Sequence, residues 1–307
     1  MAGGSGTLSG AGGASVQKDC AGQGAGLPLV VVKGAGDLGS GVVWRLRRCG
    51  FPVVVLEAPW PTVIRRGVAF AAAVYQGTVT VEGVSARRAE LGDVPALLEE
   101  GIVPVLVDPQ GLSLAHLRPD VLVDAILAKR NTGTRRSDAP LVIALGPGFR
   151  AGRDCHAVVE TARGHFLGRV YWQGEALPNT GIPGEVGGVS EERVVRAPIA
   201  GTFRALAQIG DHVRAGQALA LVDGQEVTAR IAGVVRGLLQ DGLPVHAGMK
   251  VGDVDPRGER SHCFTVSDKA LAVAGGVVEA ILCWMHGRNG IAAEGEYGQT
   301  GKSPADR

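Results

Sequence analysis

The stretch from Leu29 to Glu57 constrains the fold of this chain more than any other part of its sequence. It opens with an apolar run, Leu29–Val32, that is short enough for a strand buried on both faces, and a glycine-rich turn follows at once. Apolar residues at helical spacing then continue to a stop at Gly50. A second apolar run, Val53–Leu56, ends on Glu57. This order predicts a strand, a glycine turn, a helix and a second strand.

The glycine turn and the acid that follows it are typical of a nucleotide site. Gly34 permits the tight turn, Gly36 lets a phosphate approach the backbone, and Gly39 lets the helix pack on the strand. Glu57, 23 positions after Gly34, would accept hydrogen bonds from ribose hydroxyls. Asp37 is discordant, because a carboxylate beside a phosphate seat repels a pyrophosphate. In the alternative interpretation, Asp37 caps the helix and the glycines only form a turn.

Further apolar runs alternate with helical patterns along the chain. They are Ile102–Val107, Val121–Val123 and Leu141–Leu145. This alternation predicts an α/β protein with a Rossmann-like parallel sheet that is covered on both faces. Ligands of such sheets gather at the carboxyl ends of the strands.

Polar residues follow two of these runs, at the edge where ligands are expected. Lys129 and Asn131 come after the second run, and Arg163 and His165 come after the third. Glycines beside Lys, Arg and Asn suit an anionic or polar ligand. We predict that these four residues form the catalytic part of a polar pocket next to the glycine turn. A turn-rich connection would have much the same composition, so a purely structural role stays open.

Two adjacent arginines offer another contact for an anion. Arg65 and Arg66 follow the second strand, where they could bind phosphate or a carboxylate substrate. Two solvated arginines at the start of a helix are the structural alternative.

The titratable residues predict no metal site. Asp154, His156, Glu160 and His165 match no established ligand spacing. The five cysteines are scattered, odd in number and without a paired CxxC spacing, which is typical of free thiols in a reducing compartment. We therefore predict a cytoplasmic protein.

The charge balance and hydropathy exclude two classes of partner. The chain has 31 basic and 30 acidic residues, so it has no net field to attract nucleic acid or anionic lipid. It has no uninterrupted apolar run of about 18 residues, the length of a membrane span. The first residues lack the basic start and apolar core of a secretory signal.

An internal repeat covers residues 197–254. Ala197–Gly201 matches Ala229–Gly233 at an offset of 32, and the same offset relates Gly210 to Gly242 and Gly216 to Gly248. Each half resembles one half of the biotinyl/lipoyl-type hammerhead, a flattened barrel of two interlocked halves. Carriers of that type hold a modifiable Lys between the halves. Residues 221–227, which join the halves here, contain no Lys, so we predict no covalent biotin or lipoate.

These patterns divide the chain into five segments. We predict a disordered Gly-rich tail at 1–26, a Rossmann-like nucleotide-binding domain at 27–190, a hammerhead β-domain at 191–256, a C-terminal helix at 257–285 that docks back on the Rossmann-like domain, and a disordered tail at 286–307.

Several separate blocks resemble one protein family. The blocks VVVKGAGDLGSGV, VAFAAAVYQGTVTVEGV, ILAKRNTGT, IALGPGFRAGRDCHAVVETARGHFLGRV, KVGDVDPR and SDKALAVAGGVVEAIL look like the YqeB family. The Rossmann-like part is also similar to that of XdhC-type chaperones of molybdenum enzymes.

The resemblance implies an accessory or maturation protein of a selenium-dependent molybdenum hydroxylase. Its implied partners are the hydroxylase or the proteins that assemble its cofactor. The bound nucleotide would be NAD first, with ATP or a molybdopterin dinucleotide as alternatives. Two other functions stay open: an NAD(P)-dependent oxidoreductase with His165 or Lys129 as proton donor, and a non-catalytic adaptor. The sequence does not decide whether the chain is an enzyme or forms a homo-oligomer.

Overall fold

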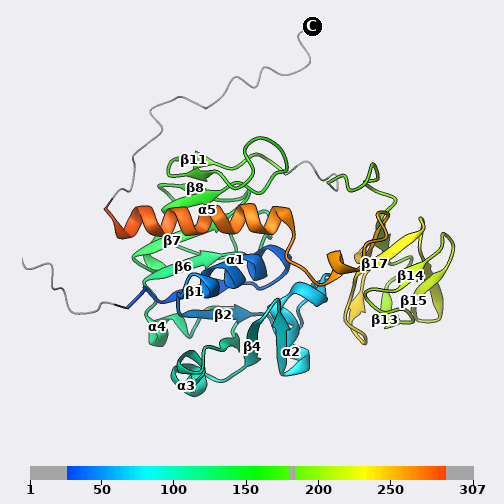
Figure 1. Ribbon diagram of the computed structural model, residues 1–307, viewed down its shortest axis with the longest axis horizontal. Helices are drawn as coiled ribbons and strands as arrows, with labels where there is room; N and C mark the ends of the chain where they lie inside the picture. Colours follow the sequence, from blue (N-terminus) through cyan, green and yellow to red (C-terminus); the bar gives the residue numbers. More distant parts are fainter. Residues whose placement is uncertain (1–25, 180, 182–183, 288–307) are drawn as a thin grey trace, which may run out of the picture.

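The computed structural model describes residues 26–179, 181 and 184–287. They form two bodies (Figure 1): a large sheet domain, made of residues 26–176 and the C-terminal helix, and a smaller β module, residues 194–255, at one end of it. The predicted disorder at 1–26 and 286–307 concerns residues that lie almost entirely outside the described ranges.

The sheet domain is built on one nine-stranded sheet. β1 lies at its centre between β2 and β6, so that Val31 is level with Val54 on one side and Leu122 on the other. The order of strands is β10 (Val170–Tyr171), β9 (Ala157–Val159), β7 (Leu141–Leu145), β6 (Val121–Asp124), β1 (Val30–Lys33), β2 (Val53–Glu57), β5 (Val103–Val107), β4 (Val84–Arg88), β3 (Thr78–Val81).

The sheet is mixed, which corrects the predicted parallel sheet. β3 pairs antiparallel with β4, and β10 pairs antiparallel with β9. The helices between successive strands are α1 (Asp37–Arg48), α2 (Ala73–Gln76), α3 (Val94–Glu99) and α4 (Leu114–Leu117), and the segment after β7 forms the short β8 (Arg150–Ala151) and β11 (Gly174–Glu175) instead. Apart from α1, the α-helices between successive strands of the sheet are only four to six residues long. The predicted fold class, a Rossmann-like parallel sheet joined to a hammerhead, is therefore wrong.

Two helices cover one face of the sheet. α1 and α5 (Asp268–Met285) run side by side over the central strands (Figure 1), and their apolar residues join one core with that face. A second core on the opposite face includes Leu97 of α3. The α1–α5 contact is close because glycine faces alanine: a Cβ on Gly41 would lie 2.7 Å from the Cβ of Ala270. The C-terminal helix α5 thus covers the part of this face that crossover helices cover in a parallel α/β sheet.

The β module is built from the repeat. Its strands form two sheets, and each strand of the first half has a counterpart 32 residues later: β13 (Gly201–Ala205) and β17 (Gly233–Leu238), β14 (His212–Val213) and β18 (Pro244–Val245), β15 (Ala218–Val222) and β19 (Lys250–Asp255). β14 of one half pairs with β17 of the other, and β18 pairs with β13, so the halves exchange strands. β12 (Val194–Arg196) and β16 (Gln225–Thr228) complete the two four-stranded sheets.

Backbone and arginine contacts join the two bodies. The amide of Leu238 donates to the carbonyl of Ile64 at 2.8 Å. Arg66 donates two hydrogen bonds to the β module, from Nε to the carbonyl of Leu238 at 2.8 Å and from Nη1 to the side-chain oxygen of Gln240 at 3.0 Å. These bonds hold the segment after β2 against β17.

Within the described ranges, no helix has the length and apolar character needed to cross a membrane.

Neighbouring glycines of α5 give opposite predictions for stability. We expect Gly276→Ala to lower the free energy of unfolding by about 1–3 kcal/mol, because the new Cβ would lie 2.2 Å from the carbonyl oxygen of Gly168, a backbone atom. Gly275→Ala meets only Arg45 at 3.8 Å and should raise it by up to about 1 kcal/mol through helix propensity. Urea denaturation of both variants measures the difference. Equal effects of the two substitutions would contradict the packing described here.

Candidate functional site

A pocket of about 410 Å³ lies at the carboxyl edge of the sheet, beyond β1, β2 and β6. Three of the four residues predicted to bind a cofactor line it: Gly34, Gly36 and Glu57. Gly34 has a φ of +85° and its amide donates to the carbonyl of Leu56 at 2.8 Å, so the first glycine makes the tight turn. Gly39 lies beneath the pocket, where a Cβ would lie 2.1 Å from the carbonyl oxygen of Gly34.

Glu57 occupies the place at which the glycine turn would offer its amides to an anion. One carboxylate oxygen accepts from the amide of Ala35 and the other from the amide of Ala58, both at 2.8 Å. Burial raises the pKa of Glu57, and the two backbone hydrogen bonds oppose that rise. Because the amide of Ala35 already has a carboxylate partner, the turn has lost an amide that a phosphate would need. The predicted nucleotide or dinucleotide at this turn stays a prediction.

A buried polar chain forms one side of this pocket. Lys33 Nζ donates to the hydroxyl of Thr134 at 2.9 Å, and that hydroxyl donates to a carboxylate oxygen of Asp124 at 2.6 Å. All three residues are buried. The chain ties the ends of β1 and β6 to the loop that follows β6, which shapes the pocket wall.

Three of the predicted catalytic residues do not enter the pocket. The Asn131 side chain bonds the amides of Gly133 and Thr134 and the carbonyl of Thr134, so it holds its own loop together. Lys129 is exposed in the same loop. His165 is also exposed, with its ring edge against Phe166.

Arg163 instead lines a larger cleft of about 1010 Å³ between the sheet domain and the β module. The cleft is contiguous with the first pocket, since Thr62, Val63 and Leu127 line both. We call it the cationic cleft, because among the described residues six cations and only two carboxylates line it: Arg65, Arg163, Arg193, Arg236, Lys250 and Lys269, with Asp37 and Asp253.

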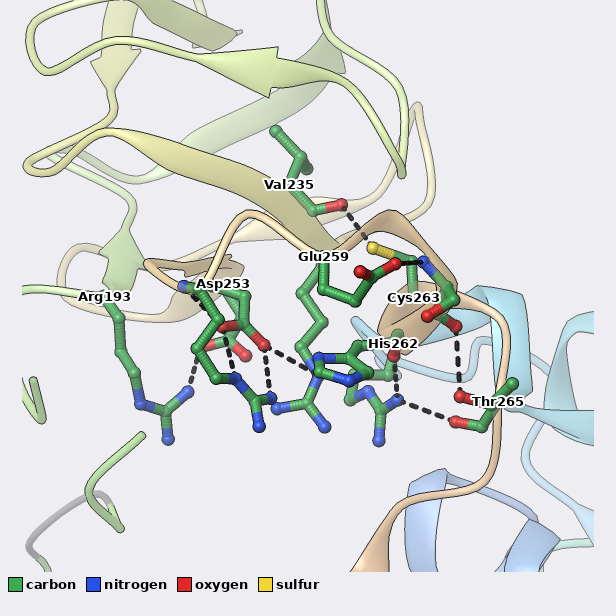
Figure 2. Close-up of polar contacts among 12 residues, drawn as sticks. Arg193, Val235, Asp253, Glu259, His262, Cys263 and Thr265 are labelled. Atoms are coloured by element: carbon green, nitrogen blue, oxygen red, sulfur yellow. Dashed lines mark hydrogen bonds and ion pairs between the residues drawn. The ribbon is translucent and has the colours of Figure 1, made fainter. Parts of the chain in front are cut away.

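Hydrogen bonds fix three of the arginines in the cationic cleft: Arg65, Arg163 and Arg193. Arg163 donates to the carboxylate of Asp268 at 2.9 and 3.3 Å. Arg65 donates to Asp37 at 2.7 Å and to the carbonyls of His262 and Thr265 at 3.0 and 3.3 Å. Arg193 pairs with Asp253 and donates to a loop carbonyl. Figure 2 shows Arg193 beside Asp253 in the β module, with His262 and Thr265 on the segment that leads back to the sheet domain.

The other three cations are held by fewer and longer contacts. Arg236 is only 8% exposed, its Nε has no hydrogen-bond partner, and the carboxylate oxygen of Asp255 lies 3.8 Å from that atom. Lys250 Nζ lies 3.9 Å from a carboxylate oxygen of Asp253. Burial is the main cause that lowers the pKa of Arg236, Lys250 and Lys269. Each of these groups would be stabilised as a cation by an incoming negative charge.

Asp37 has a different role from both sequence interpretations. It is the first residue of α1, and its carboxylate is paired with Arg65 rather than bonded to the helix amides. Of the six cations, only Arg65 and Arg163 were predicted from the sequence to contact a ligand. Lys250 and Lys269 stood in the blocks KVGDVDPR and SDKALAVAGGVVEAIL, which was the available signal for them; nothing in the sequence marked Arg193 or Arg236.

Among the described residues, no group of three or more His, Cys, Asp or Glu side chains could hold a metal ion. Glu160 is fully buried and accepts from the amides of Thr161, Ala162 and Leu177, and His156 accepts from the amide of Val142. Both side chains are thus committed to backbone groups.

The pair of Arg163 and Asp268 gives a pH-dependent prediction. The hydrogen bond from Arg163 lowers the pKa of Asp268 from 3.8 to about 2. Because the folded-state pKa is the lower one, the stabilisation from this carboxylate is present above pH 3.8 and is lost as the pH falls to about 2. In Arg163→Met we expect the pKa of Asp268 to rise toward its ordinary value, as measured by NMR titration.

The matched control is Arg153→Met, which removes the partner of Asp154 and should leave Asp268 unchanged. A pKa of Asp268 that stays near 2 in Arg163→Met would contradict the assigned cause.

Comparisons with known proteins give one relative by sequence. The chain is 52% identical over 259 residues to a protein of Escherichia coli (strain K12) described as "Uncharacterized protein YqeB", covering 84% of this chain and 48% of that protein. The chain thus spans about half the length of the curated relative it matches. No protein-family model matches the chain.

Solved structures show only distant likeness. A succinylglutamate desuccinylase from a Silicibacter species is 12% identical, with 74% of this chain and 84% of that chain covered and a TM-score of 0.23. A succinylglutamate desuccinylase/aspartoacylase from Rhodobacter sphaeroides is 15% identical, with the same coverage and a TM-score of 0.24. At these scores no activity is transferred to this chain.

The comparisons do not support the predicted function. The curated relative is described as uncharacterized, so it assigns no activity. The predicted role in maturing a selenium-dependent molybdenum hydroxylase and the alternative of an oxidoreductase with Rossmann-type NAD binding find no support here and are not proposed for this chain. The sequence identity does support the predicted relation to the YqeB family, and the chain is a homologue of YqeB over about half of that protein's length.

Proposed function

We propose that the chain binds a small organic polyanion, phosphorylated or multiply carboxylated, in the cationic cleft between the sheet domain and the β module. The carrying observation is Arg236, a guanidinium that is 8% exposed, lines the cleft and has an Nε without a hydrogen-bond partner. A buried unpaired donor costs free energy, and a charged one costs more. An anion in the cleft would supply the missing acceptor.

The charge arrangement supports the same ligand class. Six cations against two carboxylates leave a local excess of positive charge in a chain whose overall balance is 31 to 30. Both carboxylates are already paired, Asp37 with Arg65 and Asp253 with Arg193. Arg236 and Lys250 have only long ion pairs, at 3.8 Å with Asp255 and 3.9 Å with Asp253, and Lys269 has none. These three cations are the groups that a ligand would neutralise.

The position and size of the cleft also suit a small molecule. It lies past the carboxyl edge of the sheet, where ligands of α/β proteins bind. Its volume of about 1010 Å³ is at the upper end of small-molecule sites. Ser267, the N-cap of α5, lines it too, so the positive end of a long helix faces the same space. The ligand would contact both bodies at once.

Two variants that each remove one arginine charge test the proposed binding site. We expect Arg236→Gln to weaken polyanion binding by about 10- to 100-fold, the loss of one charge-assisted hydrogen bond worth about 1.5–3 kcal/mol. Arg230→Gln is the control, because Arg230 is exposed and does not line the cleft. Calorimetric titration with pyrophosphate and ATP tests the phosphorylated class, and titration with citrate tests the carboxylate class.

A polyanion that binds should also raise the melting temperature, with about 2.7 kcal/mol of stabilisation at 100 times its dissociation constant. Lys269→Gln serves as a second cleft variant in case Arg236→Gln does not fold. Equal affinity of the Arg236 and Arg230 variants, or no response to any of the three ligands, would refute the proposal.

A further inference from the structure

We propose that the amine of Lys269 forms an imine with a carbonyl-bearing anion held in the cationic cleft. This inference rests on the proposed function, since the cleft must first bind the anion. It adds a reactive group to the site and narrows the ligand to an anion that also carries an aldehyde or ketone.

Lys269 stands at the start of α5 and lines the cleft. The two residues that precede it in the chain already make hydrogen bonds. Ser267 accepts a hydrogen bond from the amide of Ala270, and the carboxylate of Asp268 is bound by Arg163 at 2.9 and 3.3 Å. The first turn of the helix thus leaves the amine of Lys269 without a carboxylate partner among the described residues.

The other described lysines differ in this respect. Lys33 donates to Thr134 at 2.9 Å, and Lys250 lies 3.9 Å from a carboxylate oxygen of Asp253. Lys129 donates to the side-chain oxygen of Asn179 at 3.1 Å when the amide of Asn179 is flipped to satisfy its hydrogen bonds. Of the four lysines that the structure describes, Lys269 is the one with no hydrogen bond or ion pair. An amine without an anionic partner is free to react.

The electrostatic surroundings favour the reactive, neutral form of this amine. Burial lowers the pKa of Lys269, and the charge of Arg163 lowers it further. The negative charges of Asp37, Glu160 and Asp268 raise the pKa of Lys269. Each of them already has a partner, because Asp37 is paired with Arg65, Asp268 is paired with Arg163, and Glu160 accepts from backbone amides. A lower pKa increases the neutral fraction at a given pH, and only the neutral amine is nucleophilic.

Arg236 supplies the second requirement, an anchor for the anion. It is buried, its Nε is unpartnered, and it lines the same cleft as Lys269. With the anion held there, the carbonyl of the same molecule is brought to the amine, which raises its effective concentration.

The reaction needs no redox partner. The amine nitrogen of Lys269 attacks the carbonyl carbon, and the C=O π electrons move to oxygen, giving a carbinolamine after proton transfer. The oxygen then leaves as water with the two protons that the amine nitrogen loses. A C=N bond has replaced the C=O bond, with one water released.

The test uses pyridoxal 5′-phosphate, a probe that carries both an aldehyde and a phosphate. The full-length chain is incubated with the probe at neutral pH, borohydride reduces the imine to a stable secondary amine, and peptide mass spectrometry locates the adduct. We expect labelling of Lys269 about tenfold or more above that of Lys33, Lys129 and Lys250, because the phosphate concentrates the aldehyde at the cleft. Pyridoxal, which lacks the phosphate, should label Lys269 more slowly.

Two variants complete the design. Lys269→Arg keeps the charge but not the nucleophile, and it should lose the dominant adduct. Lys129→Arg, an exposed residue that does not line the cleft, should keep it. Even labelling of all lysines, or dominant labelling of Lys250, would overturn the inference.

Pyrophosphate binding by the wild type and Lys269→Arg separates the two proposals. If both bind pyrophosphate and no Lys269 adduct forms, the imine is refuted and the anion site stands. If neither pyrophosphate nor the phosphate-bearing probe binds, both proposals fall.

Discussion

The hydrogen bond from the amide of Leu238 to the carbonyl of Ile64 is the contact on which the cleft depends. It joins β17 of the β module to the segment that follows β2, and Arg66 reinforces it from the neighbouring position. A Cβ on Gly237 would lie 3.0 Å from the same carbonyl oxygen, so the approach needs a residue without a side chain. This contact and the bonds of Arg66 hold the two bodies together beside the space that their cations line.

Like charges gathered in one cleft repel each other, and their burial adds a desolvation penalty. The protein offsets part of this by pairing Arg65 with Asp37 and Arg193 with Asp253. Arg236 has only a 3.8 Å contact with Asp255, and Lys269 has no ion pair among the described residues. We regard this incomplete neutralisation as the mark of a binding site, because perturbed and unpaired groups in a cleft are more common in sites than in frameworks.

The glycine turn shows how a familiar pattern can serve the fold. Gly34 and Gly39 do what the pattern demands of the backbone: one makes the turn and the other lets α1 lie against it. Glu57, the predicted ribose contact, binds the amide of Ala35 within that turn. A sequence motif specifies residue types at given spacings, whereas the direction of a long acidic side chain depends on what surrounds it.

The sequence by itself determined the buried strands, the tight turn at Gly34 and the strand repeat at 32 residues, because apolar periodicity and backbone freedom are local properties. The full order of the mixed sheet was not predictable from those signals, since the pairing of β10 with β9 depends on contacts between segments that local patterns do not specify. Only the tertiary structure decided the cationic cleft. Arg65, Arg163, Arg236 and Lys269 lie far apart in the chain, and their charges meet because the β module docks beside the carboxyl edge of the sheet.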